Sequence, residues 1–330
     1  MSCKIHAATQ ENFVAMAEVL TQGGLVALPT ETVYGLAAQA TNESAVRMIF
    51  HVKGRPLIDP LIVHVLDNSM AQGIAEWNDD AQACAEAFWP GPLTMILPKK
   101  DSVPDLITAG LDTVAVRSPH HEVFRSILQG CGFPLAAPSA NPFGYISPST
   151  AEHVFSMLND RLEHIIDGGQ CQHGVESTIL DLSSEQPIIL RPGPIVASQL
   201  EPKLGKKVLQ RSSFHNEKNA TSQKAAGQMM RHYSPRTSAR LFQELPLKIS
   251  QTACVFLQRP NTDIINQITA QNGDVFWLSE SGQSEEMMRH LYSMLHKLDK
   301  MNFRYLYFQM PDEKESSAAL LDRLKRACAN

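Results

Sequence analysis

Short apolar runs alternate with amphipathic stretches along the first 200 residues of the chain. Apolar residues at three- and four-residue spacing predict helices, and short uninterrupted apolar runs predict buried strands. The predicted helices cover residues 11–21, 44–52, 79–88, 121–128 and 149–158. The predicted strands cover residues 25–28, 61–65, 93–97, 114–117, 135–137, 165–167, 177–182 and 188–190. Strands and helices are interleaved without a strict β-α-β repeat, so we expect a mixed, twisted α/β sheet with helices on its faces.

The pattern changes after residue 200. Residues from about 201 to 240 are polar and basic, which is typical of a linker, although Tyr233 lies in a segment of large and aromatic side chains. Predicted strands at 253–257, 275–278 and 305–309 then alternate with predicted helices at 285–298 and 318–327. These elements predict a second, smaller Rossmann-like α/β domain. We therefore divide the chain into a first domain over residues 1–205, a linker or lid over 206–240 and a C-terminal domain over 241–330.

Composition and charge exclude several classes of protein. The chain of 330 residues is 43% hydrophobic and 19% charged, as expected for a globular protein with two cores. The net charge of -5 argues against sequence-blind nucleic-acid binding over a broad basic face. The six cysteines are scattered without a C-x-x-C pair, which favours free thiols in a reducing cytosol over disulfides or zinc. No signal peptide or membrane-spanning run is visible, so we expect a cytoplasmic location and no membrane partner.

Four polar segments follow or precede predicted strands, at residues 29–36, 53–56, 137–142 and 173–178. They are rich in hydroxyls, glycine, proline and guanidinium groups. Each phosphate or carboxylate oxygen of a bound ligand needs a donor, and these are suitable donors. The sequence therefore predicts a site for an anionic, polyoxygenated ligand.

Most of these residues also have an ordinary structural explanation. Thr30 or Thr32 alternatively caps the segment that follows, and Lys53 and Arg55 alternatively satisfy the carbonyl end of a helix. His64 lies inside a predicted strand. It is either packed in the protein interior and hydrogen-bonded to its neighbours, or it binds a ligand. Spacing alone leaves these alternatives open.

Four further patterns bear on the chemistry of the site. Arg117, at the end of a predicted strand, is placed to clamp a carboxylate, and the turn at 137–150 leads to a helix N-terminus, where anions are favoured. Plain turn chemistry is the alternative for that segment. The motif G-x-S-x-G is absent, so Ser177 is interpreted as a binding hydroxyl and not as a nucleophile. His120 and His121 have no third ligand at suitable spacing, so we expect no metal site.

Seven segments, in this order, resemble the YrdC-like domain of the threonylcarbamoyl-adenylate synthase family. They are PTETVYGL, KGRP with PLIVHV, PGPLTMIL, VAVRSP, APSANPFGYISPS, GVESTILDL and ILRPGP. The resemblance covers about residues 8–200. The later RHYSP and the small C-terminal domain resemble the longer, two-domain form of that family.

The resemblance implies a nucleotidyltransferase reaction. L-threonine, bicarbonate and ATP give L-threonylcarbamoyl-adenylate and pyrophosphate, with Mg²⁺ expected to accompany the departing pyrophosphate. Separate tRNA threonylcarbamoyl transferase proteins then modify the adenosine beside the anticodon of tRNAs that read codons starting with A. Any direct tRNA contact of this chain is expected to be weak or indirect.

The resemblance also implies site residues. The positions matching the threonine pocket are Thr32, His64, Arg117, the Ala137 backbone and Ser177. The positions matching the ATP site are Arg55, Asp59, Thr113, Ser139, Ser147, Arg191 and Tyr233, with Lys53 and Arg55 as catalytic cations. The family often carries asparagine where this chain has Asp59, and a carboxylate is a poorer neighbour for a triphosphate than an amide.

Two other functions compete with this one. An RNA-binding or nucleotide-sensing module without catalysis is disfavoured by the net negative charge and by arginines at loop ends instead of along one face. A carbamoyl-transferring maturation protein shares the fold, but such proteins usually carry zinc-finger-like cysteine motifs that this sequence lacks.

Overall fold

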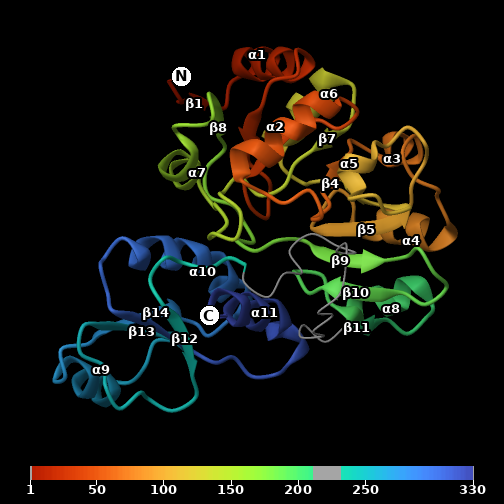
Figure 1. Ribbon diagram of the computed structural model, residues 1–330. Coiled ribbons are helices and arrows are strands. Elements are labelled where there is room, and N and C mark those ends of the chain that lie inside the picture. Colours follow the sequence, from red (N-terminus) through yellow and green to blue (C-terminus); the bar gives the residue numbers. More distant parts are fainter. Residues whose placement is uncertain (1, 211–231, 330) are drawn as a thin grey trace. The chain divides into compact units, whose positions relative to one another are not determined.

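The computed structural model describes residues 2–210 and 232–329 (Figure 1). The chain forms two compact units. The first comprises Met1–Phe143, Pro148–Gln172 and Glu176–Gln228, and the second comprises Gly144–Ser147, His173–Val175 and Met229–Asn330. Part of the predicted lid, residues 211–231, lies outside the described residues.

The first unit is built on one mixed sheet of 11 strands, in the order β1-β8-β2-β3-β7-β4-β6-β5-β9-β10-β11. Its strands are β1 (Lys4–Ala7), β2 (Val26–Leu28), β3 (Gly35–Gln39), β4 (Ile62–His64), β5 (Leu93–Pro98), β6 (Thr113–Arg117), β7 (Leu135–Ala136), β8 (His164–Asp167), β9 (Thr178–Asp181), β10 (Ile188–Arg191) and β11 (Leu209–Gln210). Its helices are α1 (Gln10–Thr21), α2 (Glu43–Lys53), α3 (Asn68–Gln72), α4 (Asp79–Phe88), α5 (Asp105–Thr108), α6 (Glu122–Cys131), α7 (Ala151–Leu158) and α8 (Ala197–Leu204). The predicted mixed sheet is confirmed.

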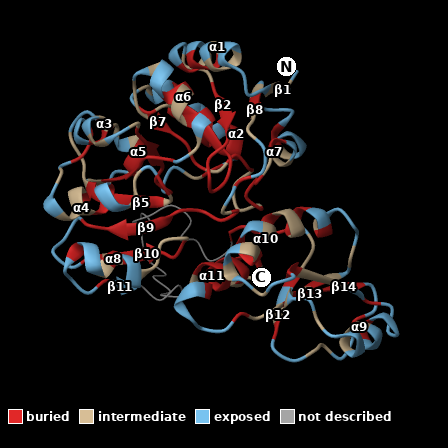
Figure 2. Ribbon diagram, turned by 180° about the vertical axis from the view of Figure 1, so that it is seen from behind, coloured by how far each residue is buried: buried red, intermediate tan, exposed pale blue. Residues whose placement is uncertain are grey.

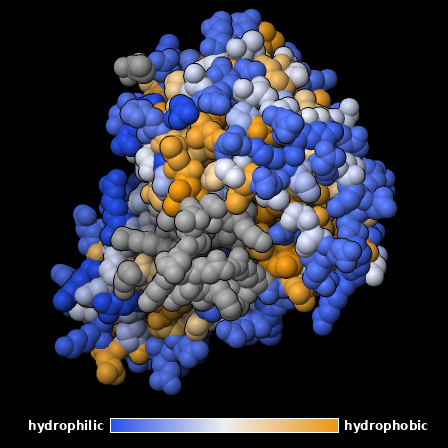
Figure 3. Space-filling view, turned by 45° about the vertical axis from the view of Figure 1, so that its right-hand side comes forward, coloured by the Kyte–Doolittle hydropathy of each residue, from blue (hydrophilic) through white to orange (hydrophobic). Residues whose placement is uncertain are grey.

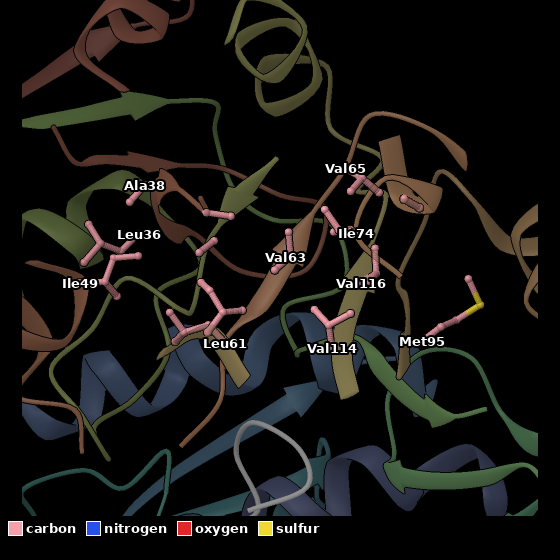
Figure 4. Packing of buried hydrophobic residues seen from close by; sticks show 14 of the residues in the cluster. Leu36, Ala38, Ile49, Leu61, Val63, Val65, Ile74, Met95, Val114 and Val116 are labelled. Atoms are coloured by element: carbon pink, nitrogen blue, oxygen red, sulfur yellow. The ribbon is translucent and has the colours of Figure 1, made fainter. Parts of the chain in front are cut away.

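The two faces of this sheet carry different side chains. Val63, Met95 and Val116 belong to the largest apolar cluster of the first unit (Figure 4). Side chains alternate along a strand, so the neighbouring residues point to the opposite face. That face holds a small apolar cluster, which consists of Ile62, Ile96, Ala115, Ile179 and Leu190. His64 shares this second face with Ile62, and Arg117 shares it with Ala115.

Local capping fixes where several helices begin and end. The side chain of Asn42 accepts a hydrogen bond from the Ala45 backbone N–H and starts α2. Gly54 ends α2 in the left-handed conformation, at φ 62°, which glycine adopts without steric cost. The helices expose one side and bury the other (Figure 2). The visible surface is mostly hydrophilic, with smaller apolar patches (Figure 3).

The second unit contains a sheet of four parallel strands in the order β12-β15-β13-β14. The strands are β12 (Ala239–Phe242), β13 (Thr252–Gln258), β14 (Asp274–Ser279) and β15 (Tyr305–Gln309). The helices are α9 (Thr262–Thr269), α10 (Ser284–Asp299), the 3-10 helix Glu315–Ser317 and α11 (Ala318–Ala327). This parallel α/β arrangement agrees with the predicted Rossmann-like domain.

Two short segments from earlier in the sequence pack within the second unit. The Ser234 backbone N–H donates to the Gly144 carbonyl at 2.9 Å. The Tyr145 hydroxyl donates to the Asp299 carboxylate at 2.5 Å. The buried His296 Nε2 lies 3.1 Å from the Ser147 carbonyl oxygen. Residues 144–147 therefore take their partners from the second unit, which sequence order does not suggest.

The structure adds elements that the sequence pattern does not predict. β11, the end of α8 and the start of β12 fall within the polar stretch interpreted as a linker. α9 lies between the predicted strands 253–257 and 275–278. No helix among the described residues is long and apolar enough to cross a membrane.

Candidate functional site

Adjacent strands of the first unit bring predicted site residues to one edge of the sheet. β4 ends at His64 and β6 ends at Arg117, and these two residues are register partners in a parallel pair. β5 is antiparallel to β6 and starts at this edge, with Thr94 near the level of Arg117. β9 runs parallel to β5 and follows Ser177 directly. His64, Arg117 and Ser177 therefore lie along one edge.

Arg117 is buried and its guanidinium is held from several sides. Nη1 donates to the Thr32 hydroxyl at 2.9 Å, and Nε donates to the Gly91 carbonyl at 3.2 Å. Nη2 lies 2.8 Å from a Glu31 carboxylate oxygen. The hydroxyl of Thr30 lies 2.8 Å from that of Thr32 and fixes this segment. The guanidinium predicted to clamp a carboxylate is thus held in a fixed position.

His64 is a neutral histidine in this structure. Burial, and then the nearby Arg117 charge, lower the pKa of His64 to about 3. Its ring centroid lies 5.2 Å from that of Phe124. Nδ1 of His64 has no hydrogen-bond partner among the described residues. Backbone contacts of the ring with Ile62 and Leu135 partly offset this lowering of the pKa.

The Ala137 backbone lies against β3 and β4. Its N–H donates to the Ile62 carbonyl at 3.2 Å, and the next carbonyl, of Pro138, accepts from Leu36 at 2.7 Å. A side chain at Gly35 would meet the Ala137 Cβ at 3.2 Å. Glycine at position 35 therefore permits this close approach.

Ser177 and Arg191, predicted for different subsites, are joined directly. Arg191 Nη2 donates to the Ser177 hydroxyl and Nε donates to the Ser177 carbonyl, both at 3.1 Å. The Ser177 hydroxyl also lies 2.7 Å from the Thr94 hydroxyl. This arrangement places a guanidinium beside a pair of hydroxyls.

Lys53 is buried and points at backbone carbonyls. Its Nζ donates to Ser139 O at 2.5 Å and to Asn141 O at 2.7 Å. Burial, and then the Arg55 charge, hold the pKa of Lys53 well below its usual range. Lys53 thus fixes the segment that carries Ser139.

Arg55 is bound within its own loop. Its Nη2 lies 3.0 Å from an Asp59 carboxylate oxygen, and both side chains are buried. Nε donates to the Asp59 carbonyl at 3.1 Å and Nη2 to the Pro60 carbonyl at 2.8 Å. A carboxylate therefore neutralises the guanidinium predicted to bind phosphate.

Thr113, predicted for the ATP site, lies away from this edge, and two other predicted ATP residues belong to the second unit. Thr113 opens β6 on the same face as Arg117, roughly 13 Å along the strand. Ser147 and Tyr233 belong to the second unit. The Tyr233 backbone has φ 60°. The centre of its ring lies 5.7 Å from that of Tyr292 and 5.1 Å from the Arg323 guanidinium.

Sequence reasoning did not assign roles to Glu31 and Thr94, which contact predicted site residues. A carboxylate flanked by two threonines in PTETVYGL is the signal that could have singled out Glu31. For Thr94, within the apolar strand Leu93–Pro98, the sequence offers only its hydroxyl. Among the described residues, no group of three or more His, Cys, Asp or Glu could hold a metal ion.

The fold is that of a two-unit α/β protein whose first unit buries several cationic side chains, among them Arg117 and Arg191. The family described as "Telomere recombination" matches residues 18–193. The family described as "Threonylcarbamoyl-AMP synthase, C-terminal domain" matches residues 195–329. Both matches follow the order of the two predicted domains.

Relatives of known name cover nearly the whole chain. The threonylcarbamoyl-AMP synthase of Pyrococcus abyssi is 37% identical over 317 residues, covering 94% of this chain and 92% of that protein. The Bacillus subtilis threonylcarbamoyl-AMP synthase is 35% identical, covering 94% and 91%. The crystal structure of P. abyssi Sua5 complexed with L-threonine matches with a TM-score of 0.85 at 33% identity, covering 98% and 97%. The chain belongs to the threonylcarbamoyl-AMP synthase family.

Proposed function

We propose that this protein synthesises L-threonylcarbamoyl-adenylate from L-threonine, bicarbonate and ATP and releases pyrophosphate. The observation that carries the proposal is the edge formed by Arg117, Thr32 and neutral His64, in a chain of this family. The relative whose structure contains L-threonine supports the choice of amino acid.

The threonine pocket would use each group for a different part of the substrate. Arg117 suits the carboxylate, because a guanidinium binds a carboxylate through two parallel hydrogen bonds. Thr32 and His64 suit the side-chain hydroxyl, because neutral imidazole and hydroxyl groups donate and accept. The Ser177 hydroxyl and the Ala137 backbone complete the proposed pocket.

The proposed ATP site holds the nucleotide by cations and hydroxyls. Its proposed residues are Arg55, Asp59, Thr113, Ser139, Ser147, Arg191 and Tyr233. The carbamate oxygen of carboxylated threonine attacks the α-phosphate, and pyrophosphate leaves. Positioning and charge stabilisation carry this step without an enzyme nucleophile. Arg55 stabilises charge on the phosphates, and Lys53 keeps the Ser139 segment in place.

Mg²⁺ is proposed to arrive with ATP. Mg²⁺ is usually held by phosphate oxygens, waters and one or two carboxylates, so it needs no cage of protein ligands. The product is proposed to pass, in the cytoplasm, to tRNA threonylcarbamoyl transferase proteins, with weak or indirect contact of this chain with tRNA.

The test is a reconstituted reaction. Purified protein is incubated with ATP, threonine and labelled bicarbonate, and an acid-labile threonylcarbamoyl-adenylate is expected. Omission of threonine or of bicarbonate should abolish pyrophosphate release. Equal pyrophosphate release without threonine would overturn the proposal and favour a nucleotide-binding or hydrolysing role.

A further inference from the structure

Glu31 places a buried carboxylate against Arg117, the guanidinium of the proposed threonine pocket. Its side chain is 3% exposed, and one oxygen lies 2.8 Å from Arg117 Nη2. It stands between Thr30 and Thr32 in a segment that contacts Arg117. A buried carboxylate at this position needs a physical explanation, because burial of a charge is costly unless the charge is compensated.

This carboxylate is ionised. Burial raises the pKa of Glu31. The Arg117 charge, the contact with its guanidinium, and the backbone N–H groups of Glu31 and His120 lower this pKa by more than burial raises it. The net pKa is below the usual value. Burial keeps its other neighbours neutral, since it lowers the pKa of His121 and raises that of the Cys171 thiol.

The Glu31–Arg117 pair leaves binding capacity on both charges. A guanidinium has five N–H donors. Thr32, Gly91 and Glu31 each take one, so two remain among the described residues. A carboxylate accepts about four hydrogen bonds. Apart from the ion pair, neither Glu31 oxygen has a hydrogen bond of good geometry in the part of the chain that the structure describes.

We propose that Glu31 binds the α-ammonium group of threonine while Arg117 binds its α-carboxylate. An α-amino acid carries both charges on one carbon, so its two charged groups are neighbours, as Glu31 and Arg117 are. The ammonium group of the ligand then neutralises Glu31 and its carboxylate neutralises Arg117, so every buried charge has a partner of opposite sign. Glu31 is then a specificity-determining residue that selects amino acids over acids without an amine. This inference rests on the proposed function.

A different role for Glu31 makes a different prediction. If Glu31 only holds Arg117 in place, its loss weakens every ligand that carries a carboxylate by the same factor. If Glu31 binds the ammonium group, its loss weakens only ligands that carry an amine. A pair of ligands that differ at the α-substituent separates the two roles.

The experiment titrates L-threonine and 2,3-dihydroxybutanoate of matching configuration by calorimetry. The second ligand has a hydroxyl where threonine has the ammonium group. The wild type should prefer threonine by roughly 10- to 150-fold, as expected for a charge-assisted contact. In Glu31→Gln this preference should fall to within about 3-fold. Glu18→Gln, at an exposed glutamate on α1, should keep the wild-type preference.

The outcomes are separable. A preference that persists in Glu31→Gln, with both ligands weakened alike, would overturn the inference and leave Glu31 as a holder of Arg117. If Glu31→Gln does not fold, Glu31→Asp is titrated instead. Its carboxylate is one methylene shorter, so the preference for threonine should fall part of the way, whereas a holder role would leave the preference at the wild-type value. Failure of the wild type to bind threonine would instead refute the proposed function. If the wild type forms the product but Glu31→Gln still prefers threonine over 2,3-dihydroxybutanoate as strongly as the wild type does, only this inference is refuted.

Discussion

At the scale of single residues, buried charges define the site. Arg117 pairs with Glu31 and Arg55 pairs with Asp59, and all four side chains are buried. A lone buried charge would be costly, so each pair keeps a guanidinium in place before any ligand arrives. The two proposed subsites should therefore respond separately to substitution.

Arg55→Ala should weaken ATP use more than threonine binding, and Arg117→Ala should do the reverse. A buried charge-assisted contact to an anion contributes about 1.5–3 kcal/mol, roughly 10- to 150-fold in affinity. Calorimetric titration of both ligands against both variants measures this, and each variant is the control for the other. Interchanged phenotypes would mean that the two subsites are assigned the wrong way round.

Asp59→Asn should lower the KM for ATP by about 5- to 30-fold, which corresponds to about 1–2 kcal/mol. The Asp59 carboxylate lies 3.0 Å from Arg55 and competes with phosphate for its charge. Threonine affinity should not change, and Tm without ligand should fall because a buried pair is broken. The exposed substitution Asp101→Asn is the control. A raised KM would instead indicate that Asp59 holds a cation that ATP needs.

The buried histidine should make stability depend on pH. The pKa of His64 is about 3 when folded and near 6.5 when unfolded, so the unfolded chain binds the extra proton between these values. Stability from this group is complete above pH 6.5 and falls by about 1.4 kcal/mol per pH unit toward pH 3. The unfolding free energy, measured with urea at several pH values, should depend on pH less steeply by this amount in His64→Gln than in the wild type. Equal slopes in both proteins would contradict a neutral buried His64.

At the scale of elements, the ends of strands set the distances between functional groups. β10 ends at Arg191 beside the chain that enters β9, and Gly193 allows this approach. A Cβ at Gly193 would lie 2.3 Å from the Thr178 backbone nitrogen. The close backbone approach of these two strand ends therefore fixes the distance between Ser177 and Arg191.

Gly193→Ala should destabilise the first unit by about 2–3 kcal/mol, because the backbone around Thr178 must move apart. Gly54→Ala is the matched control. Gly54 has φ 62° and open space around its Cβ position, so only the conformational cost of about 1 kcal/mol applies. Denaturant unfolding of both variants gives the comparison. Similar losses would show that the β9–β10 contact adapts easily.

At the scale of the whole molecule, the second unit contains Ser147 and Tyr233, two residues proposed for the ATP site. Tyr233 is 1% exposed and packs on Tyr292 and Arg323. These contacts give the second unit a direct influence on residues predicted to bind ATP. Exclusion of water from a labile mixed anhydride is the expected benefit.

Tyr233→Ala should lower the yield of product per ATP consumed while the first unit stays folded. Deletion of residues 227–235 should act in the same direction. Tyr233→Phe keeps the ring packed on Tyr292 and should stay near the wild-type yield. Hydrogen exchange around Tyr233 should slow when ATP and threonine bind together. Unchanged exchange and full coupling after the deletion would leave the segment as a tether.

The sequence by itself determined the class of fold, the family and most of the residues proposed for the site. Apolar runs and capping residues are local signals, so they predict β4, β6, α4 and α10 well. The seven resembling segments name His64, Arg117 and Ser177 as site residues, and the sheet brings these to one edge.

Only the tertiary structure decided which groups pair with which. The Glu31–Arg117 pair and the Lys53–Ser139 contact join residues separated by more than eighty positions, and no local pattern encodes such separations. The same holds for the attachment of Tyr145 to Asp299 in the second unit. Burial then sets the charge states of these residues, because desolvation depends on everything packed around a group and not on its neighbours in sequence.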